Sequence, residues 1–113
     1  YGGAFPVWLA PIQVMIIPVA DRHLDYARQL ETELRNEGIR VKVDKRSERV
    51  NLKIRQAQLD KIPYMLVVGD KEVAASIISV RLRSGEQAAS QTLDSFKESV
   101  KLAITSKTRD LKL

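Results

Sequence analysis

The sequence predicts an α/β fold: a three-layer domain in which a mixed, mostly parallel sheet of about five strands is flanked by three helices. The first observation is the order of the hydrophobic patterns, which alternate strand, helix, strand, helix, strand over the first two thirds of the 113 residues. The second is an alternating strand pattern that follows closely behind the last buried strand, which favours antiparallel pairing there. The composition, 44% hydrophobic and 29% charged, is typical of a globular domain.

The first half of the chain contains two predicted strands with a helix between them. A continuous aliphatic run over 12–19 predicts a strand that is covered on both faces. Apolar residues recur at helical spacing over 22–37, with Asp21 placed as the N-cap and Gly38 placed to end the helix. Residues 39–43 then alternate between apolar and basic side chains, which predicts a half-exposed strand.

The second half contains the remaining predicted elements. Helical spacing predicts a helix over about 50–60, and the apolar run 64–68 predicts another buried strand. The alternating segment 76–85 is joined to that strand by a short turn, so we expect it to run antiparallel. A last helix is expected over about 92–107, where apolar residues again recur at helical spacing.

Several classes of function are excluded by residues that the sequence lacks. The chain has no cysteine, which excludes disulfides and thiolate metal or redox sites, and its single histidine, His23, is expected at the surface. The longest apolar run, 14–20, is too short to span a membrane. No phosphate-binding glycine motif, zinc-protease motif or nucleophile elbow occurs. We therefore expect no catalytic, cofactor-binding or metal-binding residue in this chain.

Positive charge is concentrated in the middle of the chain. Residues 40–83 hold eleven basic and five acidic side chains, whereas the chain as a whole has a net charge of +5. Such asymmetry indicates a polyanionic partner, most simply nucleic acid, although an ordinary basic surface explains the excess equally well at this point. For a nucleic-acid partner, the cations expected to contact phosphates are Lys45, Arg46, Arg49, Lys53 and Arg83.

A carboxylate and a guanidinium in the second half have the chemistry to recognise a guanine. A carboxylate accepts from the N1 and N2 donors of an unpaired guanine, and an arginine donates to O6 and N7. Glu72 follows the end of strand 64–68, and Arg81 faces outward from the next strand. Ser47 follows the end of strand 39–43, and ligands of open α/β sheets collect beyond such strand ends. The alternative is that Glu72 and Arg81 form a surface salt bridge.

Five segments of the sequence, taken in order and at their spacing, resemble a known family. They are GAFPVWLAP, GIRVKVD, KIR, IPYMLVVGDKE and VRLRSG. Together they closely resemble the C-terminal anticodon-binding domain of bacterial threonyl-tRNA synthetases, and the resemblance covers essentially the whole chain. It implies the mixed sheet with three helices described above. It also implies that 1–11 is the junction with a catalytic domain and that 12–113 is the anticodon-binding domain.

The resemblance implies roles for three residues. Glu72 stands in the family's GDKE motif and Arg81 is the first arginine of its RxRxG motif. In the family these two positions recognise the middle anticodon base, a guanine. Ser47 stands where an asparagine often reads the last anticodon base, a uridine, and a hydroxyl at this position retains one donor and an acceptor.

The same resemblance implies the partners and the setting. The partners would be the anticodon stem-loop of threonine tRNA and the catalytic domain of a parent synthetase, which would charge that tRNA with threonine. ATP, magnesium and zinc would belong to the parent enzyme, with no cofactor in this chain. The parent would be a cytoplasmic homodimer that does not contact a membrane.

Two other functions stay open. One is an anticodon-binding-like domain of another class II synthetase or of an accessory protein. The other is a doubly wound module that binds a small molecule or nucleotide. A steep weakening of binding as salt rises would distinguish RNA binding from nucleotide binding.

Overall fold

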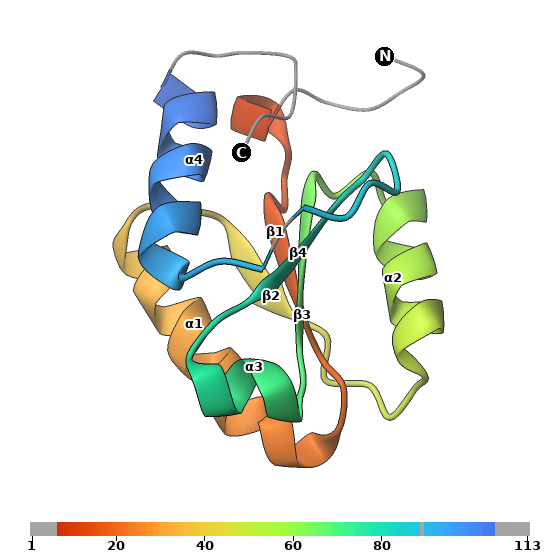
Figure 1. Cartoon of the computed structure of the whole chain (residues 1–113). Helices are drawn as coiled ribbons and strands as arrows, with labels where there is room; N and C mark the ends of the chain where they lie inside the picture. Colours follow the sequence, from red (N-terminus) through yellow and green to blue (C-terminus); the bar gives the residue numbers. More distant parts are fainter. Residues whose placement is uncertain (1–6, 89, 106–113) are drawn as a thin grey trace.

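The structure is a computed structural model that describes residues 7–88 and 90–105. Within these ranges it contains one sheet of four strands with helices on both faces (Figure 1). The strands are β1 (Val14–Pro18), β2 (Val41–Val43), β3 (Tyr64–Val68) and β4 (Ser79–Leu82). They lie side by side in the order β2-β1-β3-β4. The predicted mixed α/β fold is confirmed.

Helices form a layer on each face of the sheet. In the described ranges they are η1 (Val7–Leu9), η2 (Asp21–His23), α1 (Leu24–Asn36), α2 (Val50–Leu59), α3 (Asp70–Ala75) and α4 (Leu93–Thr105), the two η elements being 3-10 helices. Figure 1 shows α1 and α4 on one face of the sheet and α2 on the other. The buried side chains of α1 and α4 share one core cluster with the sheet, and those of α2 belong to a second cluster. This is the predicted three-layer arrangement. The last two residues of the predicted helix 92–107 lie outside the described ranges.

The strand directions also agree with the prediction. β1 pairs in parallel with β2 and with β3, and β4 runs antiparallel to β3. Both parallel connections carry a helix, α1 before β2 and α2 before β3, as parallel crossovers require. The carboxyl ends of β1, β2 and β3 therefore meet at one edge of the sheet.

The predicted strand count of about five is wrong, because the described residues form four strands. The chain does return beside β4, but only through isolated bridges from Gln87 to Arg81 and from Gln91 to Ile78. This returning segment is rich in alanine and polar residues, and it lacks the β-branched and aromatic side chains that favour a regular ladder.

The short turn predicted between the third and fourth strands is instead the helix α3. Glu72 reaches back from the first turn of this helix, and its Oε1 accepts the Gly69 N–H at 2.8 Å. This contact is half of a capping box, which stabilises even a short helix at its start. Ser76 ends the helix in the left-handed conformation, with φ 55°.

The start of α1 differs from the prediction at two residues. Asp21 is the first residue of η2 and makes no capping hydrogen bond, so its assignment as the N-cap is wrong. His23 is buried, with a side chain 3% exposed, whereas the sequence predicted a surface histidine. Its Nδ1 accepts the N–H of Ala20 at 3.1 Å and thereby takes over the capping role. The predicted end of the helix is confirmed, since Gly38 has φ 79° just beyond α1.

Most of the predicted junction 1–11 lies outside the described residues, which begin at Val7. The part that is described packs onto the domain. Val7 and Ala10 are almost fully buried, and the side-chain amide of Gln13 donates to the Val7 carbonyl at 3.0 Å.

Candidate nucleic-acid interface

The carboxyl edge of the parallel strands collects two of the predicted base-reading residues. Because β2 and β3 both run parallel to β1, the loop after β2 and the helix after β3 emerge at this same edge. The loop contains Ser47, whose side chain is exposed, and α3 contains Glu72. This is the location at which open α/β sheets bind ligands.

Glu72 is held in one orientation with part of its carboxylate available. Its Oε1 accepts the Gly69 N–H at 2.8 Å, and no hydrogen bond engages Oε2 in the described part of the chain. Glycine at position 69 leaves room for this contact, since a Cβ there would lie 3.1 Å from Val19 Cγ2, a tight approach. The free oxygen can therefore accept from a ligand without any rearrangement of the capping contact.

Arg81 lies on β4 directly opposite Met65, on the face of the sheet that α2 covers. Its side chain is half-buried, and its Nε is fully buried without a hydrogen-bond partner among residues 7–88 and 90–105. Burial of an unpaired donor is unfavourable, which makes this guanidinium a candidate for binding an acceptor.

Glu72 and Arg81 do not contact one another, so the structure does not show the surface salt bridge considered from the sequence. Arg81 lies opposite Met65, and the Glu72 carboxylate is bound to the backbone of Gly69, four residues further along the same extended segment. At about 3.3 Å per residue, Met65 and Gly69 are about 13 Å apart. The carboxylate and the guanidinium are therefore separate groups of this surface, and each is left to bind a ligand without the other.

The loop after β2 is closed by an ion pair between Asp44 and Arg46. Arg46 donates from Nε to Oδ1 at 3.0 Å and from Nη2 to Oδ2 at 2.8 Å. Asp44 is 8% exposed, and the hydrogen bonds from Arg46 lower the pKa of its carboxyl despite this burial. The Asp44 carboxylate correspondingly raises the pKa of Arg46. The positive charge of Arg46 is thus compensated within the loop.

Lys53 points toward the backbone and not toward solvent. The side chain, on α2, is 4% exposed, and its Nζ donates to the carbonyls of Pro18 at 3.3 Å and Asp44 at 3.5 Å. These two carbonyls terminate β1 and follow β2. Lys53 therefore ties α2 to the carboxyl edge of the sheet.

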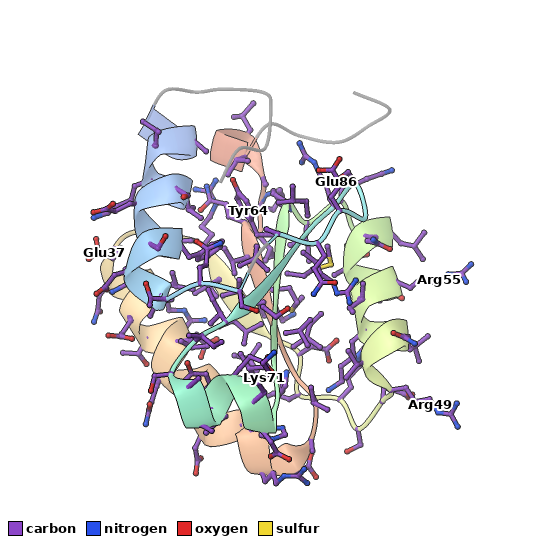
Figure 2. All side chains as sticks on the ribbon, in the orientation of Figure 1. Glu37, Arg49, Arg55, Tyr64, Lys71 and Glu86 are labelled. Atoms are coloured by element: carbon purple, nitrogen blue, oxygen red, sulfur yellow. The ribbon has the colours of Figure 1, made fainter. Side chains whose placement is uncertain are left out.

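Lys45 and Arg49 are exposed cations of the predicted phosphate-binding set, as is Arg46, but they differ from Arg46 in their pairing. Neither forms an ion pair within the described ranges, and Figure 2 shows Arg49 and Arg55 projecting from the α2 side away from the sheet. A groove of about 760 Å³ lies beside the loop, and Lys42, Lys45 and Lys53 contribute to its lining. Lys42 was not selected from the sequence, although its outward position in the alternating strand 39–43 was predicted.

Arg83 lies at the opposite edge of the sheet from Ser47 and Glu72. Its backbone N–H donates to the carbonyl of Pro63 at 3.1 Å, just before the amino end of β3. Burial lowers the pKa of the Arg83 guanidinium. Burial also raises the pKa of the neighbouring Tyr64 hydroxyl to about 12. The structure therefore does not bring Arg83 together with the loop cations.

Two kinds of site are not found in the described residues. They contain no group of three or more His, Cys, Asp or Glu side chains arranged to hold a metal ion. They also contain no helix that is both long enough and apolar enough to cross a membrane.

Comparison with known proteins assigns the chain to a family. The family model described as Anticodon binding domain matches residues 13–102. The chain is 67% identical to a threonine-tRNA ligase of Dehalococcoides mccartyi over 77% of its length, and 50% identical to that of Clostridioides difficile over 95%. It spans only 15% and 17% of these two relatives.

A crystal structure of a similar protein has the same fold as this chain. The RNA-binding domain of threonyl-tRNA synthetase from Cryptosporidium parvum superimposes with a TM-score of 0.83 and 32% identity, covering 88% of this chain and 25% of that one. Because the family model also covers most of the sequence, the chain belongs to the Anticodon binding domain family.

Proposed function

We propose that this chain recognises the anticodon loop of threonine tRNA as the anticodon-binding domain of a threonine-tRNA ligase. The observation that carries the proposal is the state of Glu72 and Arg81: a carboxylate fixed by Gly69 with one oxygen free, and a guanidinium with a buried, unpaired Nε. The names of the relatives and of the similar crystal structure support the choice of tRNA.

The middle guanine of the anticodon would be bound by both of these side chains. Its N1 and N2 donors face the free oxygen of Glu72, and its O6 and N7 acceptors face Arg81. Ser47, exposed on the loop after β2, would bond the last anticodon base, a uridine, through its hydroxyl. A base splayed from a single-stranded loop exposes all of these edges.

Phosphate contacts would position the loop without reading its sequence. Lys45 and Arg49 are exposed and would contact phosphates directly. Arg46 is paired with Asp44 and would hold the loop. Lys53 donates to backbone carbonyls, so it would add positive potential as well as hold the loop. Arg83, at the opposite edge, would contact a more distant part of the RNA.

The rest of the reaction belongs to a parent enzyme that is longer than this chain. The catalytic domain of that enzyme would bind ATP and magnesium and charge the tRNA with threonine. The described residues do not offer a ligand cluster suited to zinc, so we place the zinc in the parent's catalytic part. We also propose that the parent is a cytoplasmic homodimer.

The proposal is tested by titrating the chain with labelled anticodon stem-loops at two salt concentrations. We expect the threonine stem-loop to bind more tightly than stem-loops with other anticodons, and all binding to weaken steeply as salt rises. ATP and other free nucleotides serve as competitors. Tight nucleotide binding with little salt dependence would instead support the small-molecule module, and preference for another anticodon would support another synthetase.

A further inference from the structure

The helix that carries Glu72 is not held in place by hydrophobic packing. None of the six side chains of α3 is buried, and Val73, its largest apolar residue, is 38% exposed. Helices of globular domains are normally positioned by an apolar face. The orientation of α3 therefore has to depend on polar contacts.

The first residue of α3 is fixed by two side chains that lie 47 and 48 positions earlier in the sequence. Arg22 donates to Asp70 from Nε at 2.9 Å and from Nη2 at 2.8 Å, in a two-point contact. The Nε2 of His23 lies 2.6 Å from Asp70 Oδ1. Because Nδ1 of this imidazole accepts the Ala20 N–H, Nε2 carries the proton and donates to the carboxylate.

The segment that follows α3 is held by a side chain of α1. The hydroxyl of Tyr26, on α1, donates to the carbonyl of Ile77 at 2.9 Å. Figure 1 shows α3 against the N-terminal end of α1, consistent with these contacts. Burial raises the pKa of Tyr26, and the Glu33 and Glu72 carboxylates raise it further, which indicates that the charge of Glu72 is close to this phenol.

We infer that Asp70, His23 and Tyr26 are positioning residues for Glu72, which hold both ends of α3 on α1 so that the free carboxylate oxygen faces the middle anticodon base. The inference rests on the proposed function. It assigns specificity to residues that do not touch the RNA. Arg22 belongs to the same set of contacts, but its side chain is 67% exposed, so the buried His23 is expected to contribute more.

The test measures one ratio, the affinity for a stem-loop with guanine at the middle position divided by the affinity for the adenine version. We expect Asp70→Asn to lower this ratio by about 5-fold to 10-fold, because Glu72 is no longer held, and Tyr26→Phe by about 3-fold. The matched control is Glu37→Gln, which removes the ion pair of Glu37 with Lys101 at the other end of α1. It should leave the ratio unchanged.

A structural role alone would lower the melting temperature and weaken every stem-loop by the same factor. An unchanged ratio in both Asp70→Asn and Tyr26→Phe would therefore overturn the inference, and Tyr26→Phe decides the matter if Asp70→Asn does not fold. Glu72→Gln is measured alongside. If that variant lowers the ratio and the other two do not, only the positioning role fails, whereas an unchanged ratio in Glu72→Gln overturns the proposed function itself.

Discussion

The guanidinium of Arg46 donates to both carboxylate oxygens of Asp44, and its backbone N–H donates to Oδ1 as well, at 3.1 Å. Two residues that are separated by one position thereby close the start of the loop that contains Ser47. Asp44 also accepts Lys53 at its backbone carbonyl, so the loop is fixed from both its side-chain and its main-chain atoms. The exposed residues of the loop, Ser47 among them, are consequently attached to a well-fixed backbone.

Acid should weaken the fold through Asp44. The contact with Arg46 lowers the pKa of this carboxyl in the folded protein, so the folded state binds fewer protons than the unfolded state as the pH falls. The stabilisation is complete above the unfolded pKa of about 3.9 and is lost as the pH falls through the lower folded pKa. Urea unfolding at pH 7, 4 and 2.5 measures this. Asp44→Asn should lower the unfolding free energy at pH 7 by about 1 to 2 kcal/mol and flatten the acid limb; an unchanged acid limb would contradict the assignment.

Substitution of Lys53 should lower the stability of the fold, whereas substitution of Lys45 should lower the affinity for RNA. Lys53→Met leaves the carbonyls of Pro18 and Asp44 without their donor, so we expect the unfolding free energy to fall by about 1 to 3 kcal/mol. Lys45→Ala removes an exposed cation, so stability should change by less than about 0.5 kcal/mol. The same variant should weaken every stem-loop alike and reduce the slope of log affinity against log salt by about 0.7. A change in base preference in Lys45→Ala would show that it does more than contact phosphate.

Removal of the Tyr64 hydroxyl should stabilise the domain. The hydroxyl is buried without a hydrogen-bond partner in the described part of the chain, and burial raises the pKa of the side chain to about 12. The ring itself forms an edge-to-face contact with Phe96, with centroids 5.4 Å apart. Tyr64→Phe keeps this contact and should raise the unfolding free energy by about 1 kcal/mol in thermal or urea unfolding. A loss of similar size would reveal a partner for the hydroxyl.

Ser76 offers a second stabilising substitution. It ends α3 with φ 55°, a conformation that costs a residue with a Cβ about 1 kcal/mol relative to glycine. Ser76→Gly should therefore raise the melting temperature slightly and leave the guanine-to-adenine binding ratio unchanged, because the contacts of Asp70 and Tyr26 are retained. Calorimetry and stem-loop titration check the two parts. A lower melting temperature would mean that the Ser76 side chain contributes more than its backbone strain costs.

The sequence pattern predicted those helices and strands that bury an apolar face. The helical stripe of α1 and its glycine end, and the alternation that buries Val41 and Val43 while exposing Lys42, are both visible in the sequence because each depends on neighbouring residues. The parallel pairing followed from the helical connections. The antiparallel direction of β4 was also predicted correctly, although the short turn on which that prediction rested is the helix α3. The family resemblance supplied the roles of Glu72, Arg81 and Ser47, which stay proposals.

The features that could not be predicted depend on contacts between distant residues. α3 has no buried side chain, so it leaves no periodic signal, and its anchor Asp70 is bonded to a histidine 47 positions away. His23 is buried beside that carboxylate, a position that its local sequence does not indicate. Lys53 looked like an exposed cation on a basic helix, and only the arrangement of strand ends shows that its ammonium is directed at two carbonyls.

The central claim, that Glu72 and Arg81 read the middle guanine, is tested most directly by changing single atoms of that base. Inosine lacks the N2 amino group expected to face Glu72. The unsubstituted chain should bind the inosine stem-loop more weakly than the guanine stem-loop by about 1 kcal/mol. The Glu72→Gln variant should bind the two stem-loops equally well. Arg81→Ala, which retains the carboxylate, should still distinguish them. A Glu72→Gln variant that keeps the full guanine-to-inosine ratio would contradict the account.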